Sequence, residues 1–276
     1  MKQERIKEIL KKFENIKIAV YGDFCLDVYW DMDLDGSEVS VETGLKAESV
    51  AKHAYSPGGA GNIVANVAAL SPKSIKVIGV VGADIYGNEL RVKLEELGAD
   101  ISALTIQKED FNTYTYIKKM YGEREDPRID FGLNNKRSRE TDQAILQHIQ
   151  TALEGQDVLI FNQQVVGSIP NEEFIEEVNM LFEEFNDTIV ILDSRHYNDK
   201  FKNVYRKSNE IETAVLNGQD VQPQDFISFS EIKKHGSKVY EQYNKPLFVT
   251  CGSRGVITFD SNGINEIPGV LINGTR

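Results

Sequence analysis

The sequence predicts an α/β fold in which helices cover both faces of a mainly parallel β-sheet. Short apolar runs rich in branched residues recur along the chain, and stretches with helical spacing lie between them. Strands that alternate with helices in this way build parallel sheets buried on both sides. The predicted strands are residues 16–21, 75–81, 158–161, 188–192 and 247–250.

The helices are predicted from apolar residues at spacings of three and four. The chain opens with this pattern, at Ile6, Ile9, Leu10 and Phe13. Further helices are predicted for residues 62–70, 90–97, 144–153, 174–185 and 232–243.

Two stretches, 27–56 and 113–131, do not follow the alternation of strands and helices. In them, polar and apolar residues alternate along the chain. They predict half-exposed antiparallel strands, which we interpret as a small β insertion beside the main sheet, spanning about 28–56 and 112–132 and acting as a lid. Two long surface loops are the alternative. The sequence shows no repeat and no linker, so residues 1–276 are expected to form a single domain.

Composition excludes several classes of protein. The chain has 276 residues and a formal net charge of −12, which does not suit binding to a nucleic-acid backbone. Its two cysteines, Cys25 and Cys251, are too few for a disulfide framework. No apolar run approaches the roughly 20 residues that span a bilayer. We therefore expect a cytoplasmic protein with no nucleic-acid or membrane partner.

The glycine-rich segment from Pro57 to Asn62 precedes an apolar helix. Gly58 and Gly59 would let a ligand approach the backbone closely, and the helix start offers free N–H groups to hydroxyls or anions. Asn62 could cap the helix or bind the ligand. The alternative is a tight turn with a close helix contact.

Familiar phosphate and metal motifs are missing from the sequence. The dinucleotide fingerprint fails because Val64 stands at the third glycine position and no strand is predicted before the segment. No Gly-Lys-Ser/Thr sequence occurs, so there is no P-loop. None of the four histidines pairs with another histidine or a cysteine at zinc-ligand spacing.

Asp23 and Asp27 follow the first predicted strand. Ligands of parallel sheets bind at the carboxyl ends of the strands, and a carboxylate can accept hydrogen bonds from two sugar hydroxyls. The pair therefore suits a polyol. Two turn or cap aspartates are the alternative.

Three later segments are weaker signals. Asp84, between Gly82 and Gly87, is interpreted first as a helix N-cap. Asn209 and Glu212 suit either a magnesium–phosphate site or a helix start with surface acids. Thr250, Gly252 and Gly255 lie in a turn that would admit a flat or anionic ligand or simply join two strands.

Taken in order, these segments resemble the ribokinase-like (PfkB) carbohydrate kinases. The matching motifs are Gly22-Asp23 with Asp27, Gly58-Gly59 with Asn62, Gly82-x-Asp84 with Gly87, Asn209 with Glu212, and Thr250-x-Gly252 with Gly255. Five motifs in the family's order are specific where each alone is not. The resemblance implies a three-layer α/β/α fold with a β lid.

The resemblance also implies roles for these residues. Asp23, Asp27, Gly58, Gly59 and Asn62 would hold the sugar. Asn209 and Glu212 would lie near the ATP phosphates and Mg²⁺, with Glu212 serving the metal, and Thr250, Gly252 and Gly255 would border the nucleotide. The lid would close over the sugar and pair with a second lid in a homodimer.

Within the family, Ala60 differs from ribokinase, which carries lysine there. The Gly-Asp-Phe start and residues 127–131 look closer to the heptose-phosphate kinase branch. Arg128 could then bind a sugar phosphate. Pairing of Arg128 with a surface acid is the alternative.

The family places a Gly-Ala-Gly-Asp segment, with the aspartate that takes the proton from the sugar hydroxyl, soon after the late strands. Residues 1–276 contain no such segment, and it would begin near Asn273–Arg276. We expect the catalytic aspartate and the last helices to lie beyond Arg276, and this chain to have little kinase activity. A non-catalytic sugar-binding relative and a kinase for a nucleoside or another alcohol are the alternatives.

Overall fold

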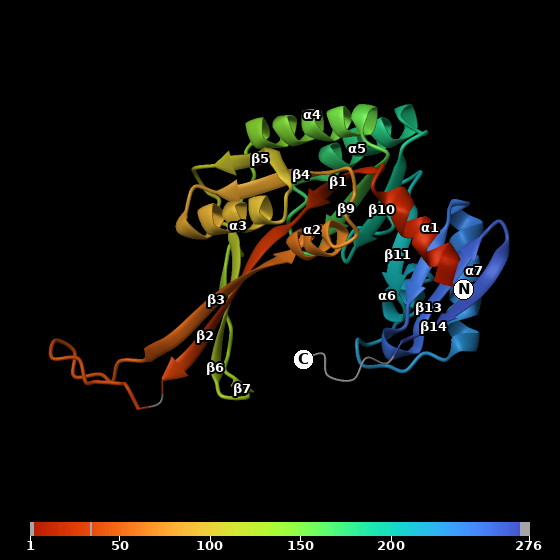
Figure 1. The fold of residues 1–276 in the computed structure, drawn as a ribbon. Helices are drawn as coiled ribbons and strands as arrows, with labels where there is room; N and C mark the ends of the chain where they lie inside the picture. Colours follow the sequence, from red (N-terminus) through yellow and green to blue (C-terminus); the bar gives the residue numbers. More distant parts are fainter. Residues whose placement is uncertain (1–2, 34, 271–276) are drawn as a thin grey trace. The chain divides into compact units, whose positions relative to one another are not determined.

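The computed structural model describes residues 3–33 and 35–270. The chain divides into two compact units, residues 1–148 (unit 1) and residues 149–276 (unit 2). The boundary falls within helix α4 (Arg139–Gly155), which is green in Figure 1.

The sheet of unit 1 has three parallel strands in the order β1-β4-β5. Their side chains form the core because neighbouring helices cover them: Ala19, Val20, Val77, Ile78 and Val81 are fully buried. Continuous apolar strands of this kind are typical of parallel sheets covered on both faces. The strands are β1 (Lys17–Gly22), β4 (Ser74–Gly82) and β5 (Asp100–Gln107).

The helices of unit 1 lie close to the predicted ranges, apart from their first turns. They are α1 (Gln3–Phe13), α2 (Ala60–Ala68), α3 (Ile85–Glu96) and the start of α4. Helix α3 begins five residues earlier than its apolar pattern suggested, because the side chain of Asp84 accepts a hydrogen bond from the Gly87 amide at 2.8 Å. The expected N-cap role of Asp84 is confirmed.

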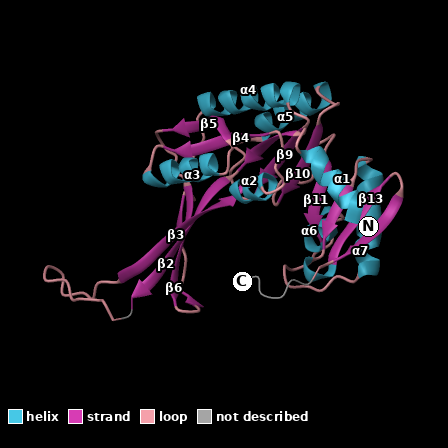
Figure 2. Cartoon of the chain, viewed as in Figure 1, coloured by secondary structure: helices cyan, strands magenta, loops and turns pink. Residues whose placement is uncertain are grey.

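Both irregular stretches form strands, so the surface-loop alternative does not hold. They build a second sheet, here called the small sheet, with the order β3-β2-β6-β7 and with β8 paired to β6 (Figure 2). Strands β2 and β3 are antiparallel, whereas β2 and β6 are parallel. The strands are β2 (Phe24–Asp33), β3 (Ser49–Gly59), β6 (Tyr114–Tyr121), β7 (Arg124–Glu125) and β8 (Ile129–Phe131).

Unit 2 carries a sheet in the order β9-β10-β11-β12-β13-β14, whose first four strands are parallel and whose last two form an antiparallel hairpin. The strands are β9 (Val158–Gln163), β10 (Ile189–Ser194), β11 (Tyr205–Asn209), β12 (Leu247–Thr250), β13 (Gly255–Asp260) and β14 (Gly263–Pro268). The helices are α5 (Glu172–Glu184), α6 (Glu210–Leu216) and α7 (Phe229–Tyr243).

Strand β11 was not predicted, because its sequence Tyr-Arg-Lys-Ser-Asn lacks an apolar run. Arg206 in its centre is only 2% exposed. The guanidinium lies 3.4 Å from the centroid of the Tyr243 ring and donates to the carbonyls of Phe201 and Val204. Burial lowers the pKa of Arg206 to about 10. The parallel strands on either side, rather than its own hydrophobicity, place this segment in the sheet.

The expected α/β class with a mostly parallel sheet is confirmed. Across residues 3–33 and 35–270, no helix is both long enough and apolar enough to cross a membrane. The position expected for the start of the Gly-Ala-Gly-Asp segment, residues 273–276, lies outside the described residues.

Candidate functional site

In unit 1 the predicted site residues gather where β1 passes into β2. Asp23, between these strands, is 7% exposed. Its carbonyl oxygen accepts a hydrogen bond from the Ala60 amide at 2.9 Å, which fixes the start of α2 against the end of β1. Gly59 has a φ of 54°, and a Cβ there would lie 2.3 Å from the same oxygen. No other residue fits this position without moving the backbone.

Asp27 lies over Gly58. A Cβ on Gly58 would come within 2.7 Å of Asp27 Oδ2, so glycine leaves room for the carboxylate. The other oxygen, Oδ1, is 3.3 Å from the ammonium of Lys118 on β6. Lys118 also donates to the Tyr29 hydroxyl at 3.1 Å, with its nitrogen 4.6 Å from the centroid of that ring. A half-buried carboxylate is therefore paired with a lysine from a neighbouring strand.

Arg128 precedes β8 and forms a bidentate ion pair with Asp130, at 2.5 and 2.7 Å. Its guanidinium stacks 4.2 Å from the centroid of the Tyr116 ring. The hydrogen bonds to Asp130 raise the pKa of Arg128. The alternative in which Arg128 pairs with an acid is therefore realised, and the side chain remains 44% exposed.

Asn62 is exposed and is the third residue of α2. It does not cap the helix, because the N-cap position is occupied by Gly59. The expectation that no strand precedes the glycine segment was also wrong: β3 runs into it. That strand belongs to the small sheet, and the missing third glycine still separates the segment from a dinucleotide fingerprint.

Cys25 is adjacent to these residues but is not a nucleophile. It is 2% exposed, and burial followed by the charge of Asp23 raises its pKa far above the usual range. A buried thiol of this kind is inert.

The Gly82, Asp84 and Gly87 motif joins α3 to the small sheet. Asp84 Oδ2 accepts from the Thr113 amide at 2.8 Å, while Oδ1 caps α3. The Thr113 hydroxyl in turn accepts from the Gly82 amide at 3.0 Å. A Cβ on Gly87 would lie 2.4 Å from the Gly82 carbonyl oxygen. This motif fixes the residue immediately before β6, and both carboxylate oxygens of Asp84 take part in holding the chain.

In unit 2, Asn209 and Glu212 form a capping box at the start of α6. The Asn209 side chain accepts from the Glu212 amide and the Glu212 side chain accepts from the Asn209 amide, both at 2.8 Å. The helix-start alternative is thus realised for both residues. Burial, more than the nearby Asp193, raises the pKa of Glu212. Asp193 itself is paired with Lys207 at 3.2 Å.

The turn from Thr250 to Gly255 contains two glycines whose surroundings differ. Gly252 has a φ of 57° and open space around it, whereas a Cβ on Gly255 would lie 2.0 Å from the Ile267 carbonyl oxygen. Gly255 therefore serves the β13–β14 hairpin, and Gly252 leaves the surface of the turn clear. The Thr250 hydroxyl donates to the Ser208 carbonyl at 3.4 Å, which ties β12 to β11.

Arg254 holds this turn in place within unit 2. It pairs with Glu210 at 2.8 Å and donates to the Ile227 carbonyl at 2.8 Å. Its guanidinium also lies about equally far from the rings of Phe226 and Phe229. The start of α6 and the loop before α7 are thereby connected to the turn.

In unit 2, Glu212 is the carboxylate that would hold a phosphate-bound magnesium ion. Such an ion needs one or two carboxylates, and substrate phosphates and water supply its other ligands. Glu212 offers a half-buried carboxylate with a raised pKa, whose charge a cation would stabilise. Within the described residues, no group of three or more acidic, histidine or cysteine side chains is arranged for a metal held by protein alone.

Two cavities border residues that contact the site described above or its neighbours. One of about 380 Å³ in unit 1 borders Asp130 and is lined by Asp110, Asn112, Asp130, Phe131, Gly132, Leu133, Asn134 and Asn135. One of about 280 Å³ in unit 2 borders Phe226 and Ile227, next to Arg254.

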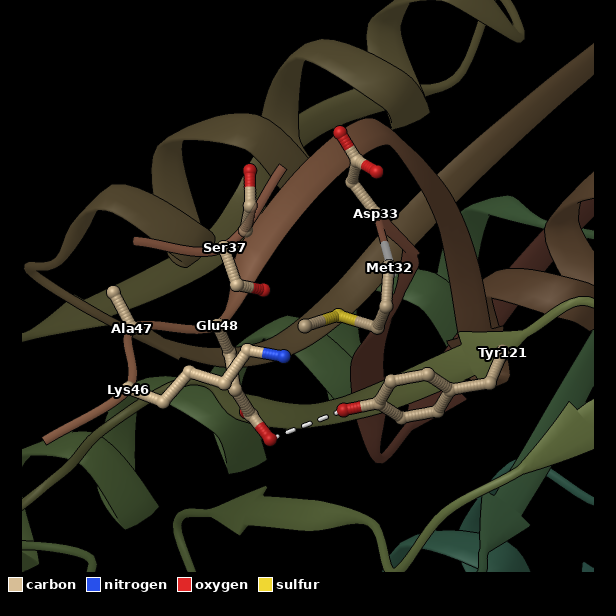
Figure 3. A pocket seen from close by; sticks show the side chains of 8 residues that line it. Met32, Asp33, Ser37, Lys46, Ala47, Glu48 and Tyr121 are labelled. Carbon is tan, nitrogen blue, oxygen red and sulfur yellow. Dashed lines mark hydrogen bonds between the residues drawn. The ribbon is translucent and has the colours of Figure 1, made fainter. Parts of the chain in front are cut away.

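A third cavity, of about 240 Å³, lies at the tip of the small sheet (Figure 3). Two of its lining residues bond to each other, since the Tyr121 hydroxyl donates to Glu48 at 3.0 Å, and Glu48 also pairs with Lys119 at 3.3 Å. None of the predicted site residues lines it. We do not assign a ligand to it.

Sequence reasoning missed Lys118 and Tyr116. Both lie on β6, beside the predicted Asp27 and Arg128. Alternation along residues 114–118 indicated a strand, but nothing local in the sequence shows which distant residue Lys118 would meet.

The model of the pfkB family carbohydrate kinases matches residues 15–273. The chain belongs to this family. Bifunctional protein HldE of Coxiella burnetii (strain RSA 331) is 31% identical over 159 residues, which is 58% of this chain and 32% of the relative. HldE of Shewanella amazonensis is 28% identical over 164 residues, covering 59% and 33%. The match thus spans about a third of the length of these curated relatives.

Solved pfkB-type structures share the fold. Phosphofructokinase-2 of Escherichia coli, in complex with fructose 6-phosphate, has a TM-score of 0.65 at 13% identity and covers 95% of this chain and 82% of its own. Ribokinase of Cryptococcus neoformans in complex with ADP has a TM-score of 0.66 at 14% identity, covering 95% and 81%. At these identities the likeness establishes the ribokinase-like fold, as the sequence motifs implied.

Proposed function

We propose that this chain binds a sugar or sugar phosphate in unit 1 and ATP with Mg²⁺ in unit 2, for ATP-dependent phosphorylation of a sugar hydroxyl. Membership of the pfkB family supports the reaction class. The observation that carries the sugar site is the Asp27 carboxylate, which lies over Gly58 and is paired with Lys118.

Asp27 supplies the chemistry that a polyol needs, because carboxylate oxygens accept hydrogen bonds from neighbouring hydroxyls. Asp23, Gly58, Gly59 and Asn62 would complete the sugar site. Asp23 and Gly59 do so by fixing the backbone, through the tight contact between the Asp23 carbonyl and the start of α2. Asn62 is exposed and available to a ligand.

The geometry of Arg128 supports the proposal that the sugar is phosphorylated. Its Nε and one terminal nitrogen bond to Asp130, which leaves guanidinium N–H groups for a phosphate oxygen. The resemblance to the heptose-phosphate kinase branch points the same way.

For ATP, the start of α6 and the turn from Thr250 to Gly255 form the proposed nucleotide site. Asn209 and Glu212 shape the helix start, and Glu212 would hold Mg²⁺, which neutralises phosphate charge when bound. Thr250 and Gly255 shape the turn, and Gly252 leaves it open to the nucleotide.

Residues 1–276 contain no Gly-Ala-Gly-Asp segment, so we propose that they supply ligand binding without the general base. A polypeptide of these residues should bind ATP and sugar yet turn over slowly. An ATP-coupled assay tests this directly, and ordinary kinase turnover by residues 1–276 would contradict it.

The sugar site is tested by calorimetry on the wild-type chain and Asp27→Asn. The variant keeps the size of the side chain but loses the charge, so sugar affinity should fall about 10- to 100-fold while ATP affinity is unchanged. Loss of both affinities would indicate misfolding, and loss of neither would refute the assignment of Asp27.

A homodimer that pairs small sheets is a further part of the proposal. Val39, Val41 and Leu45, in the segment between β2 and β3, are each at least 61% exposed, and apolar side chains gathered in one segment favour an interface. Sedimentation of the wild-type chain and of a Val41→Asp variant would test it. We also propose that the protein acts in the cytoplasm.

Two other functions predict different results. A non-catalytic sugar-binding protein would bind sugar without turnover even in a naturally complete chain. A kinase for a nucleoside or another alcohol would prefer that acceptor in a substrate panel.

A further inference from the structure

One face of the small sheet carries a row of charged and aromatic side chains. In the register, Asp27 pairs with Tyr116, Tyr29 with Lys118, and Tyr116 with Asp130. Paired residues project to the same face of a sheet. This surface, here called the polar face, therefore carries Asp27 and Tyr29 from β2, Tyr116 and Lys118 from β6, and Asp130 from β8.

Two cations approach this face from opposite sides of Tyr116. Lys118 meets Asp27 and Tyr29 on the β2 side. Arg128 meets Asp130 and stacks on Tyr116 on the β8 side. Asp27, which Lys118 contacts, is the register partner of Tyr116, on whose ring Arg128 stacks.

We infer that Lys118 is a specificity-determining residue that, together with Arg128, binds the phosphate group of a phosphorylated sugar whose hydroxyls are held by Asp27. This inference rests on the proposed sugar site and deepens it.

Each cation keeps donors for such a ligand. A lysine ammonium has three N–H donors, and Lys118 uses two of them, on Asp27 and Tyr29. An arginine has five, and Arg128 uses two on Asp130. Each cation therefore has N–H groups left for a phosphate oxygen while its own ion pair stays intact.

The contacts of Lys118 also restrict where its ammonium can go. Its side chain is 21% exposed, and both Asp27 and the Tyr29 ring hold the nitrogen on the polar face. A positioned cation loses less side-chain entropy when a ligand binds than a freely rotating lysine does. The next residue, Lys119, points to the other face and pairs with Glu48, so it provides a matched control.

The experiment is calorimetry on the full chain with three pairs of probes: ribose and ribose 5-phosphate, fructose and fructose 6-phosphate, and sedoheptulose and sedoheptulose 7-phosphate. The wild type should bind at least one phosphorylated sugar more tightly than its free sugar. Lys118→Met should lower that affinity about 10- to 100-fold and change the affinity for the free sugar less than about 3-fold. Lys119→Met should change neither, and Lys118→Arg should retain the preference.

Equal losses for the free and the phosphorylated sugar would overturn the inference, because they would mean that Lys118 only orients Asp27. The inference also fails if no sugar phosphate binds wild type more tightly than its free sugar, including the case in which nothing binds. Binding of free sugars and ATP by wild type would then leave the proposed kinase standing, whereas absence of both would remove it too. Circular dichroism and thermal unfolding of each variant exclude a folding defect as the cause of lost binding.

Discussion

The two units use the same kinds of motif residue for different purposes. In unit 1, Gly58 and Gly59 are packed against Asp27 and the Asp23 carbonyl, and the carboxylate of the site is paired with a cation from another strand. In unit 2, Asn209 and Glu212 are bonded to each other, and Gly252 faces open space. A motif match therefore identifies residues without saying whether their first task is to fold the chain or to contact the ligand.

The strongest test of this contrast compares Gly59→Ala with Gly252→Ala. Both residues have positive φ, but the new Cβ would collide with the Asp23 carbonyl only at Gly59. We expect Gly59→Ala to lower the free energy of unfolding by about 3 kcal/mol or more, and Gly252→Ala by only about 1–2 kcal/mol. Urea unfolding measures both, and equal losses would remove the distinction between packed and open glycines.

A second comparison concerns the helix caps, through Asp84→Ala and Asn209→Ala. Asp84 binds the amides of Gly87 and Thr113, whereas Asn209 accepts one amide hydrogen bond. Losing a cap costs about 1 kcal/mol, and a second unpaired amide adds about 1–3 kcal/mol. Thermal unfolding should therefore show a larger loss for Asp84→Ala, and a larger loss for Asn209→Ala would contradict the structure.

The variant Glu212→Gln distinguishes the role of Glu212 in the capping box from its proposed role in Mg²⁺ binding. Glutamine can still accept from the Asn209 amide, so the stability should change by less than about 0.5 kcal/mol. The lost charge should weaken Mg²⁺-dependent ATP binding about 10-fold, which ATP titrations with and without Mg²⁺ would reveal. A loss of ATP affinity that is equally large without Mg²⁺ would show that Glu212 does not act through the metal.

The smallest expected effect is a pH dependence from His235. Burial, followed by the charges of Lys234 and Lys238, lowers its pKa in the folded chain, against the weaker opposing effect of Glu231. The unfolded chain then binds the proton more readily, so stability is lost as pH falls below about 6.5. Between pH 7.5 and 5.5, His235→Gln should reduce the fall in Tm by about 1–3 °C.

The sequence was most informative where each strand or helix carries its own signal. Apolar runs such as β1 and β4 located the parallel sheet, and the ordered motifs located the family. It was least informative where a residue depends on distant partners. Strand β11 is held by its neighbours despite the buried Arg206, and Lys118 gains its place from Asp27 and Tyr29. The roles of the site residues as ligand contacts stay predictions.

Asp84 has a consequence for motion at the root of the small sheet. Because one carboxylate holds both the Gly87 and the Thr113 amides, the first turn of α3 cannot fray without releasing the chain just before β6. Fraying of that turn and loosening of the root therefore belong to one local opening event. In deuterated solvent, the two amide protons should exchange together, although 26 positions separate them in the sequence.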